Sequence, residues 1–234
     1  MTKKLFCILF TNLILVTALM LSLYSPTAQA GGKLGLYGIR MTPHGDDSQD
    51  YSRPGWGGGV HAVVPLPKQF NFLAGVAGFE YINLLDQTTA FIDNKTGLRI
   101  EQQTMQDYVR LYVGPQIGGH GNGFFRPHLG VNLALVIYTI NTDVVVPDDY
   151  NRENEIRQNL KTKTEGVFGS DITLGLDLNF SNTVVLDGGV KYLKSFSAPQ
   201  QLGAGSITIH PRYFQIYLGL GVAFEQIEKA SKEE

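Results

Sequence analysis

The last uncharged stretch of the chain, YFQIYLGLGVAF at residues 213–224, alternates between large apolar side chains and small or polar ones. Successive side chains of a β-strand point to opposite faces, so a period of two predicts a strand and not a helix. Twelve residues exceed the length of an ordinary strand, about 5–6, and suit a strand that crosses a membrane, about 9–11. The even positions form one wholly apolar face: Phe214, Ile216, Leu218, Leu220, Val222 and Phe224.

The same alternation recurs along the chain. It is clearest in FGSDITLGLDLNF, where Ile172 and Leu174 share one face and Asp171 and Thr173 the other. The first segment is ambiguous, and we place Tyr37, Ile39 and Met41 on its apolar face and Arg40 on its polar face. Together with the final stretch, the alternating segments predict eight strands; the other seven lie at residues 33–41, 53–66, 71–83, 108–117, 125–139, 168–180 and 184–192.

The connections between these strands alternate between short and long. Three are short and have the composition of tight turns: PLPKQ, GGHGNG and SNT. The other four are longer and polar, at residues 42–54, 84–106, 141–166 and 194–212. Short turns at one end and long loops at the other describe an antiparallel up-and-down barrel. Within the second long loop, DNKTG has the composition of a hairpin turn, which predicts that the third and fourth strands extend beyond the membrane.

Periodicity alone does not say which face points outward, because a water-soluble barrel of the lipocalin kind reverses the sense of the same pattern. The composition of the polar face favours a membrane barrel. This face is rich in Gly, Tyr and Asn with one or two charges per strand, which suits a crowded lumen better than a solvated surface. Aromatic residues near strand ends, such as Trp56 and Phe180, match interfacial girdles. The predicted fold class is all-β, an eight-stranded antiparallel up-and-down transmembrane β-barrel.

The N-terminus has the three parts of a cleaved signal peptide. Two early lysines precede an apolar run at residues 13–23, and Ala28-Gln29-Ala30 fits the small-x-small cleavage rule. The only cysteine of the sequence, Cys7, lies inside this segment, so we expect a mature chain without disulfides or thiolate metal sites. The predicted organisation is a signal peptide at residues 1–30, a barrel at residues 31–224 and a charged tail at residues 225–234.

Three stretches carry a family resemblance: FRPHLGVNLALVIYTIN, DITLGLDLNFSNTVVLDGGVKYL and RYFQIYLGLGVAF. With them the chain resembles the small outer-membrane barrels of Gram-negative bacteria, of the OmpA transmembrane-domain, OmpX and opacity-protein type. The resemblance implies export to the outer membrane, short turns in the periplasm and long loops outside the cell. It also implies outer-membrane lipids as partners. It further implies that the barrel-assembly machinery reads the final strand as an insertion signal, made of Phe214, Ile216, Leu218, Leu220, Val222 and Phe224, although ten residues follow Phe224 here.

No motif predicts a cofactor or a metal, and a net charge of −2 without clustered cations argues against nucleic acid as a partner. Three functions remain open. The first, which we favour, is a non-enzymatic barrel with a structural or surface-interaction role, in which the loops contact a surface ligand. The second is a lipid-modifying enzyme of the lipid A acyltransferase or deacylase type, for which Ser195 or Ser197 would have to meet His210 at the outer rim. The third is a minor pore for small solutes.

Charged side chains on the predicted lumen face bear on the choice among these functions. This face carries four cationic and four anionic side chains, and charges removed from water are costly unless they are paired. We therefore expect a filled lumen with three clusters: Glu80 with Arg110, Asp171 with Lys191, and Asp177 with Arg126 or His128. Such a plug favours the structural or interaction role over the pore. The whole predicted network comprises Arg40, Glu80, Arg110, Arg126, His128, Asp171, Asp177, Asp187 and Lys191.

Overall fold

A computed structural model gives the fold. The predicted signal peptide and the charged tail lie outside the residues that the structure describes. In the described part of the chain, no helix has the length and apolar character needed to span a membrane. The described residues are 32–45, 49, 52–66, 70, 72–92, 97, 99–119, 124–146, 156–181, 183–196, 198–202 and 205–224.

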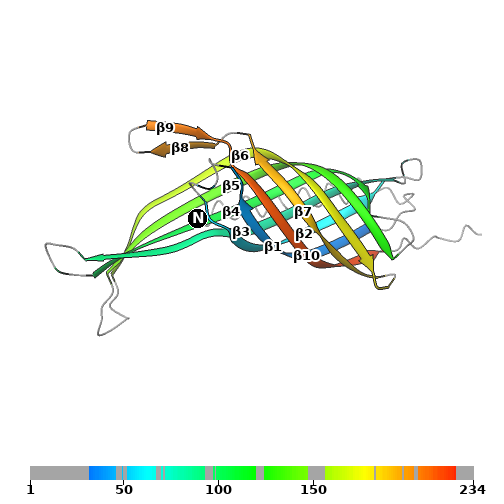
Figure 1. The fold of residues 1–234 in the computed structure, drawn as a ribbon, viewed down its shortest axis with the longest axis horizontal. Coiled ribbons are helices and arrows are strands. Elements are labelled where there is room, and N and C mark those ends of the chain that lie inside the picture. Colours follow the sequence, from blue (N-terminus) through cyan, green and yellow to red (C-terminus); the bar gives the residue numbers. More distant parts are fainter. Residues whose placement is uncertain are drawn as a thin grey trace, which may run out of the picture.

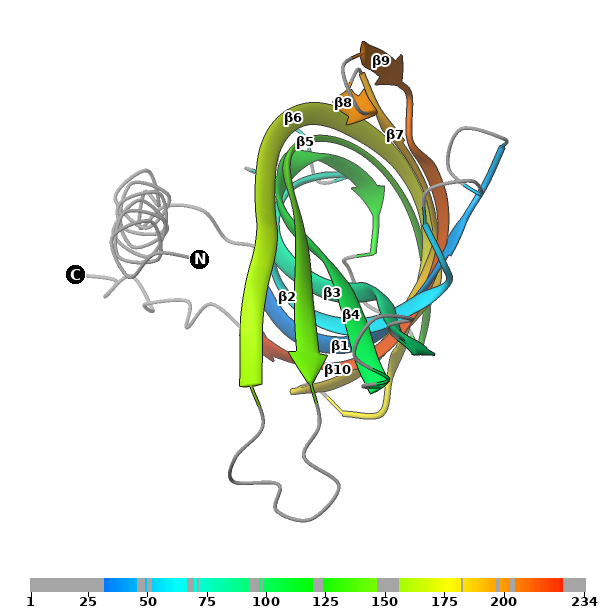
Figure 2. The ribbon, with the colours of Figure 1, turned by 90° about the vertical axis from the view of Figure 1, so that its left-hand side faces the viewer.

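Eight strands close into one antiparallel barrel in the order β1-β10-β7-β6-β5-β4-β3-β2 (Figures 1 and 2). The last strand pairs with the first along its whole length, from Gly32 opposite Phe224 to Pro43 opposite Tyr213, which completes the ring. The predicted eight-stranded antiparallel barrel is confirmed. Its strands are β1 (Gly32–Pro43), β2 (Gly55–Pro65), β3 (Leu73–Ile92), β4 (Arg99–Gly118), β5 (Phe125–Val146), β6 (Ile156–Asn179), β7 (Val184–Ser195) and β10 (Arg212–Phe224).

Two further strands form a separate hairpin, β8 (Ala198–Leu202) with β9 (Gly205–Ile209). This hairpin occupies the segment that the sequence predicted as the last long loop. Figure 1 shows it beside the barrel, at the end where β3 to β6 project. We call this end the loop end, and the opposite end, with the short connections after β2, β4 and β6, the turn end.

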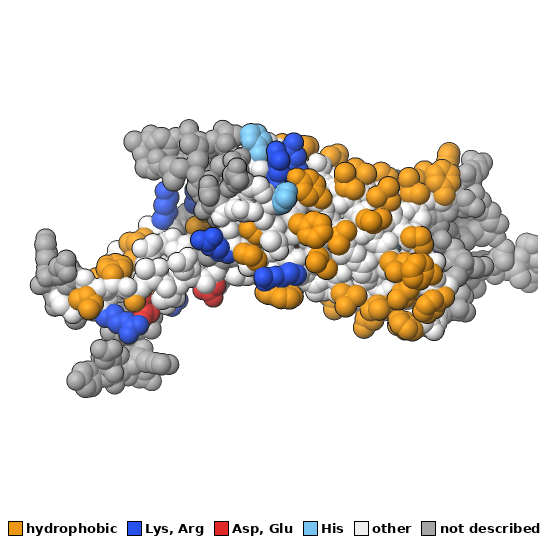
Figure 3. Space-filling view, in the orientation of Figure 1, with side chains coloured by type: hydrophobic (Ala, Val, Ile, Leu, Met, Phe, Trp, Pro, Cys, Tyr) orange, Lys and Arg blue, Asp and Glu red, His pale blue; other side chains and the backbone are white. Residues whose placement is uncertain are grey.

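The exterior of the barrel is apolar. Large aliphatic side chains stand exposed around the ring, among them Leu36 with 68%, Leu174 with 59% and Leu218 with 62% of its surface accessible. Figure 3 shows them as a belt over the barrel, with Lys, Arg and His side chains beyond it toward the loop end. A belt of this extent is stable only against lipid or another apolar surface. The apolar face therefore points outward, as predicted, and the alternative of a water-soluble lipocalin-like barrel is wrong.

The first strand corrects one prediction. Tyr37, Ile39 and Met41 are buried in the lumen, whereas the sequence pattern predicts them on the lipid side. Arg40, predicted in the lumen, lies on the exterior, where its guanidinium carbon sits 4.7 Å from the centre of the Trp56 ring. The error arose because a narrow lumen buries apolar side chains too, so hydrophobicity alone does not mark the outer face of a strand.

The neighbours of β1 give the physical reason for its orientation. Leu36 pairs with Leu220 of β10, and paired residues on adjacent strands point to the same side of a sheet. With Leu34 and Leu36 facing outward, the lipid-facing row continues across the closing seam of the barrel. The same orientation turns Lys33 into the lumen, where the sequence interpretation had not placed it.

Four consecutive strands are far longer than the others. β3 to β6 have 20–24 residues and the remaining barrel strands 11–13, so one side of the wall continues past the loop end of the barrel (Figure 1). The extension of β3 and β4 was predicted and is confirmed. The assignment of residues 141–166 to a loop is wrong for most of its length, because β5 continues to Val146 and pairs with β6 from Ile156 onward. The extended β4 supplies the edge on which β5 continues.

Candidate functional site

The middle of the lumen is built around Glu80 of β3, which is completely buried. Its carboxylate accepts hydrogen bonds from Arg110 Nη1 at 2.8 Å and Lys191 Nζ at 2.6 Å. It also accepts one from Tyr37 OH at 2.9 Å and one from Gln215 Nε2 at 3.1 Å. The donors come from β4, β7, β1 and β10, so one side chain connects five strands. A buried carboxylate of this kind is tolerated because every neighbour donates to it.

The predicted contact between Glu80 and Arg110 is present, whereas the predicted pair of Asp171 and Lys191 is absent. Asp171 pairs with Arg110 Nη2 and accepts hydrogen bonds from Asn132 at 2.8 Å and Thr173 at 2.9 Å. Lys191 instead crosses the lumen to Glu80. The prediction compared heights on adjacent strands only, and in a narrow barrel a long side chain also reaches strands on the far wall.

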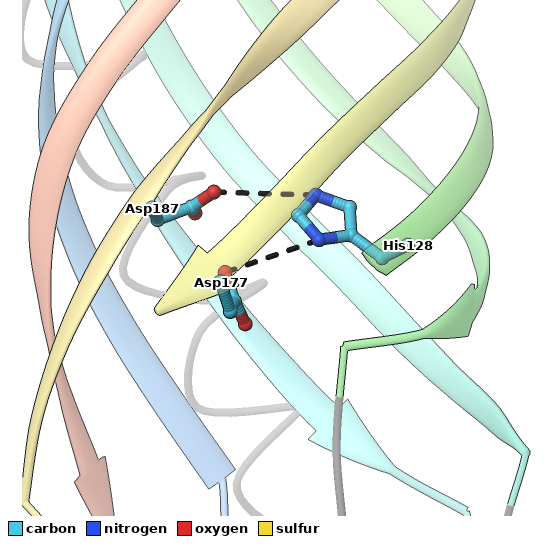
Figure 4. Close-up of side chains that lie close together, drawn as sticks. All are labelled: His128, Asp177 and Asp187. Carbon is cyan, nitrogen blue, oxygen red and sulfur yellow. Dashed lines mark ion pairs between the residues drawn. The ribbon is translucent and has the colours of Figure 1, made fainter. Parts of the chain in front are cut away.

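A second ionic cluster lies nearer the turn end. Lys33 Nζ is 2.7 Å from Asp177 Oδ1 and 3.0 Å from Asp187 Oδ2. His61 Nε2 lies 3.0 Å from the same Asp187 oxygen. His128 stands between the two carboxylates, with Nδ1 3.9 Å from Asp177 Oδ1 and Nε2 4.0 Å from Asp187 Oδ1 (Figure 4). The predicted approach of His128 to Asp177 is therefore present.

Other residues depart from the predicted network or were missing from it. Arg126, at the turn end, hydrogen-bonds to Asn179 and is not the principal partner of Asp177. Lys33 takes that place, and the sequence analysis missed it together with Gln215. An assignment of Leu34 and Leu36 to the lipid face of the first strand would have placed Lys33, which alternates with them, in the lumen. No sequence signal distinguishes Gln215 from an ordinary polar lumen residue.

Aromatic side chains close the lumen toward the loop end. The ring of Tyr108 packs edge-on against Tyr138, 5.2 Å between centres, and against Tyr213 at 5.7 Å. The hydroxyl of Tyr138 lies 2.9 Å from Ser195 Oγ, and the hydroxyl of Tyr213 lies 3.1 Å from Ser52 Oγ. Ser195, a serine considered for lipid chemistry, therefore points into the barrel. Ser197 lies outside the described residues, and His210 is exposed.

Comparison with known proteins agrees with this architecture. No protein-family model and no curated protein matches the chain. Among solved structures, Neisserial surface protein A shares 13% identity over 82% of this chain and 97% of its own, with a TM-score of 0.52. The chain has the fold of a small outer-membrane β-barrel. Two similar structures have lower TM-scores. Ail of Yersinia pestis is 11% identical over 83% of this chain and 97% of its own, with a TM-score of 0.44. A major outer membrane protein of Thermus thermophilus is 9% identical over 82% of this chain and 99% of its own, with a TM-score of 0.49.

The residues of the predicted insertion signal all lie on the exterior of this outer-membrane β-barrel. Their side chains are exposed along β10, and the polar or small residues between them face the lumen. The last of them, Phe224, pairs with Gly32 at the turn end. The six residues are Phe214, Ile216, Leu218, Leu220, Val222 and Phe224.

Side chains fill the lumen of the outer-membrane barrel closely. A Cβ atom on Gly78 would overlap the ring of Tyr112, and one on Gly175 would overlap His128 and the hydroxyl of Tyr217. A cavity of about 20 Å³ lies between the two ionic clusters. This volume is close to that of one water-sized probe, so the cavity is far too small for a solute path.

We expect the purified outer-membrane barrel to give no stable single-channel conductance in planar lipid bilayers. The reason for this expectation is that the ionic clusters and the tyrosine side chains pack closely, so that a permeating ion would have to displace bonded side chains. The control is a variant that opens both layers, Tyr108→Ala with Tyr213→Ala and Lys191→Ala, in which we expect brief current steps. Regular steps from the unaltered protein would contradict the expectation of a plugged lumen.

Proposed function

We propose that this chain is a non-enzymatic surface-interaction protein of the outer membrane, in which the barrel is the anchor and the extended sheet of β3 to β6 meets the partner. The observation that carries the proposal is the length of these four strands, which exceed the barrel wall by several residues each. In this orientation the short turns face the periplasm and the extended sheet stands outside the cell. Outer-membrane lipids surround the belt, and the assembly machinery reads β10.

The extended sheet has two open edges. β3 pairs with β2 only as far as Asn83, opposite Trp56, and continues to Ile92 with no described strand on that side. β6 pairs with β7 only from Gly169, opposite Ser195. No described strand pairs with the part of β6 from Ile156, although β8 of the separate hairpin lies near β6. An open edge presents backbone N–H and C=O groups that an extended segment of another protein can pair with.

Polar side-chain contacts fix the shape of this sheet. Asn159 donates hydrogen bonds to Asn141 Oδ1 at 2.6 Å and to Asp143 Oδ1 at 2.7 Å. Thr162 donates to the same Asn141 oxygen at 2.6 Å. These contacts connect β5 and β6 beyond the apolar belt, where the lipid no longer supports the strands. A sheet held in one conformation loses less conformational freedom when a partner binds.

A groove lies at the foot of the β3 edge, where β2 ends and β3 continues. Its volume is about 430 Å³, and it opens beside the exposed ring of Trp56. Arg53, Asp86 and Gln87 contribute charged and polar groups to its wall. Aromatic and arginine side chains around a concavity are typical of residues that dominate binding energy in interfaces. The groove therefore supports a binding role for this edge.

The proposal is tested by removing the extended sheet and keeping the barrel. Asp86 pairs with Met105 and Asn141 pairs with Thr162, so Asn-Gly turns that replace residues 87–104 and 142–161 join directly opposed positions. We expect the trimmed chain to fold, as judged by a mobility shift on boiling in detergent gels. Cells that display it should lose binding to arrays of immobilised glycans, matrix proteins and bacterial cells, whereas cells with the full chain bind. Equal binding by both chains, or no binding by the full chain, would contradict the proposal.

A further inference from the structure

We propose that the ionic cluster near the turn end of the lumen is a binding site for one divalent transition-metal ion, with His128, Asp177 and Asp187 as ligands and His61 beside them. One nitrogen or oxygen atom from each of the three residues lies within 4.8 Å of the others. They come from β5, β6 and β7, so the barrel wall fixes their relative positions. Figure 4 shows the ring of His128 directed between the two carboxylates.

Two buried polar atoms of this cluster lack a hydrogen-bond partner among the described residues, which favours a binding site here. Nδ1 of His128 and Oδ1 of Asp187 are buried and form no hydrogen bond with any described residue. Buried polar atoms without a partner are rare in native proteins, and each one indicates strain, a water molecule or an ion. Here two such atoms, one on an imidazole and one on a carboxylate, belong to the same group of side chains. Nδ1 faces Asp177, whereas Nε2 faces Asp187 and lies 3.1 Å from the hydroxyl of Tyr217. One ion therefore binds His128 through a single nitrogen, and a rotation of the side chains brings the second carboxylate to it.

The surroundings provide the space and the charge that such an ion needs. The cavity of about 20 Å³ is lined by His61, His128 and Asp187, and it has room for one water-sized particle. The Lys33 ammonium lies within 3.0 Å of both carboxylates, which shows that the cluster already stabilises a positive charge. Lys33 is the second residue of β1, close to the turn end, so its flexible side chain can leave the cluster when a metal ion enters.

The donor set indicates the class of metal. Imidazole nitrogen with carboxylate oxygen is a common ligand set for Zn²⁺ and its first-row neighbours, whereas Ca²⁺ and Mg²⁺ take oxygen ligands almost exclusively. His128 and the two aspartates provide three donors, and a water molecule would complete the tetrahedral coordination of Zn²⁺. The site is independent of the extended sheet, so it adds a property to the barrel beyond the proposed surface role.

The test is a titration of the full mature chain, refolded in detergent, with Co²⁺ and then Zn²⁺. We expect one equivalent of Co²⁺ to produce the visible absorption bands of a tetrahedral site, and one equivalent of Zn²⁺ to remove them. Lys33→Met should tighten binding by about tenfold or more, because it removes a competing charge from the cluster. This gain of affinity cannot result from a misfolded barrel. His128→Phe and Asp187→Asn should abolish the one-to-one signal, whereas His210→Ala, at an exposed position, should leave it unchanged.

Three results would overturn the proposal. The first is the absence of saturable one-to-one binding in both the unaltered chain and Lys33→Met, which would assign the cavity to water. The second is unchanged binding in a folded His128→Phe variant. The third is loss of the signal in His210→Ala, which would place the metal on the surface.

Discussion

Replacing Glu80 by methionine is expected to lower the free energy of unfolding by about 3–5 kcal/mol, because it leaves buried cations without their partner. Arg110 retains Asp171, but the Lys191 ammonium loses the carboxylate oxygen that lies 2.6 Å away. Tyr37 and Gln215 lose an acceptor as well. Urea unfolding in lipid vesicles, followed by tryptophan fluorescence or gel mobility, measures the loss.

Two variants separate this ionic effect from a loss of packing. Adding Lys191→Met to Glu80→Met removes the orphaned charge, so the double variant should be more stable than the single one. Glu101→Gln removes a pair from the extended sheet, where Arg99 is largely exposed, and should cost about 1 kcal/mol or less. The single variant Lys191→Met is measured as well. If the double variant lost as much free energy of unfolding as the two single variants together, Glu80 and Lys191 would not be coupled.

Leu174→Arg is expected to destabilise the inserted barrel by about 2–4 kcal/mol, because it places a charge at the middle of the hydrocarbon layer. Leu174 lies on the outer face of β6, five residues before the strand ends at the turn end, and its side chain is exposed to lipid. The cost is measured as the change in the free energy of unfolding from vesicles. Slower insertion should accompany it.

The matched control for this prediction is Val184→Arg, which introduces the same charge near the edge of the belt. Val184 is the first residue of β7 and also faces outward, so its arginine can reach the interface. The expected cost there is about 0–1 kcal/mol. Equal costs at the two positions would show that the belt does not follow the depth of a membrane.

The two-residue period identified the eight barrel strands because lipid and a packed lumen impose opposite demands on alternate side chains. It failed in β1, where Tyr37, Ile39 and Met41 are as apolar as a lipid-facing row. The direction of such a strand is decided by its neighbours: Leu36 faces outward because Leu220 beside it does. A single segment does not contain that information.

The lumen contacts were harder to predict than the strands. Glu80 and Arg110 lie directly opposite each other on adjacent strands, so counting residues from the turns was sufficient to pair them. Lys191 reaches Glu80 across the lumen, which depends on barrel radius and side-chain length. The extension of β5 and β6 was missed for a related reason, since their polar residues form a sheet only because β4 offers an edge to pair with.

Cysteine labelling shows on which side of the outer membrane the barrel displays the sheet of β3 to β6, which we expect to lie outside the cell. The only native cysteine, Cys7, lies in the predicted signal peptide, so a cysteine introduced elsewhere provides a single reporter. Thr89→Cys marks the extended part of β3, and Thr183→Cys marks the turn between β6 and β7; both positions are exposed. On intact cells a membrane-impermeant maleimide should label Thr89→Cys, and Thr183→Cys only after the outer membrane is opened. Labelling of Thr183→Cys on intact cells while Thr89→Cys stays protected would place the extended sheet in the periplasm and contradict a surface role.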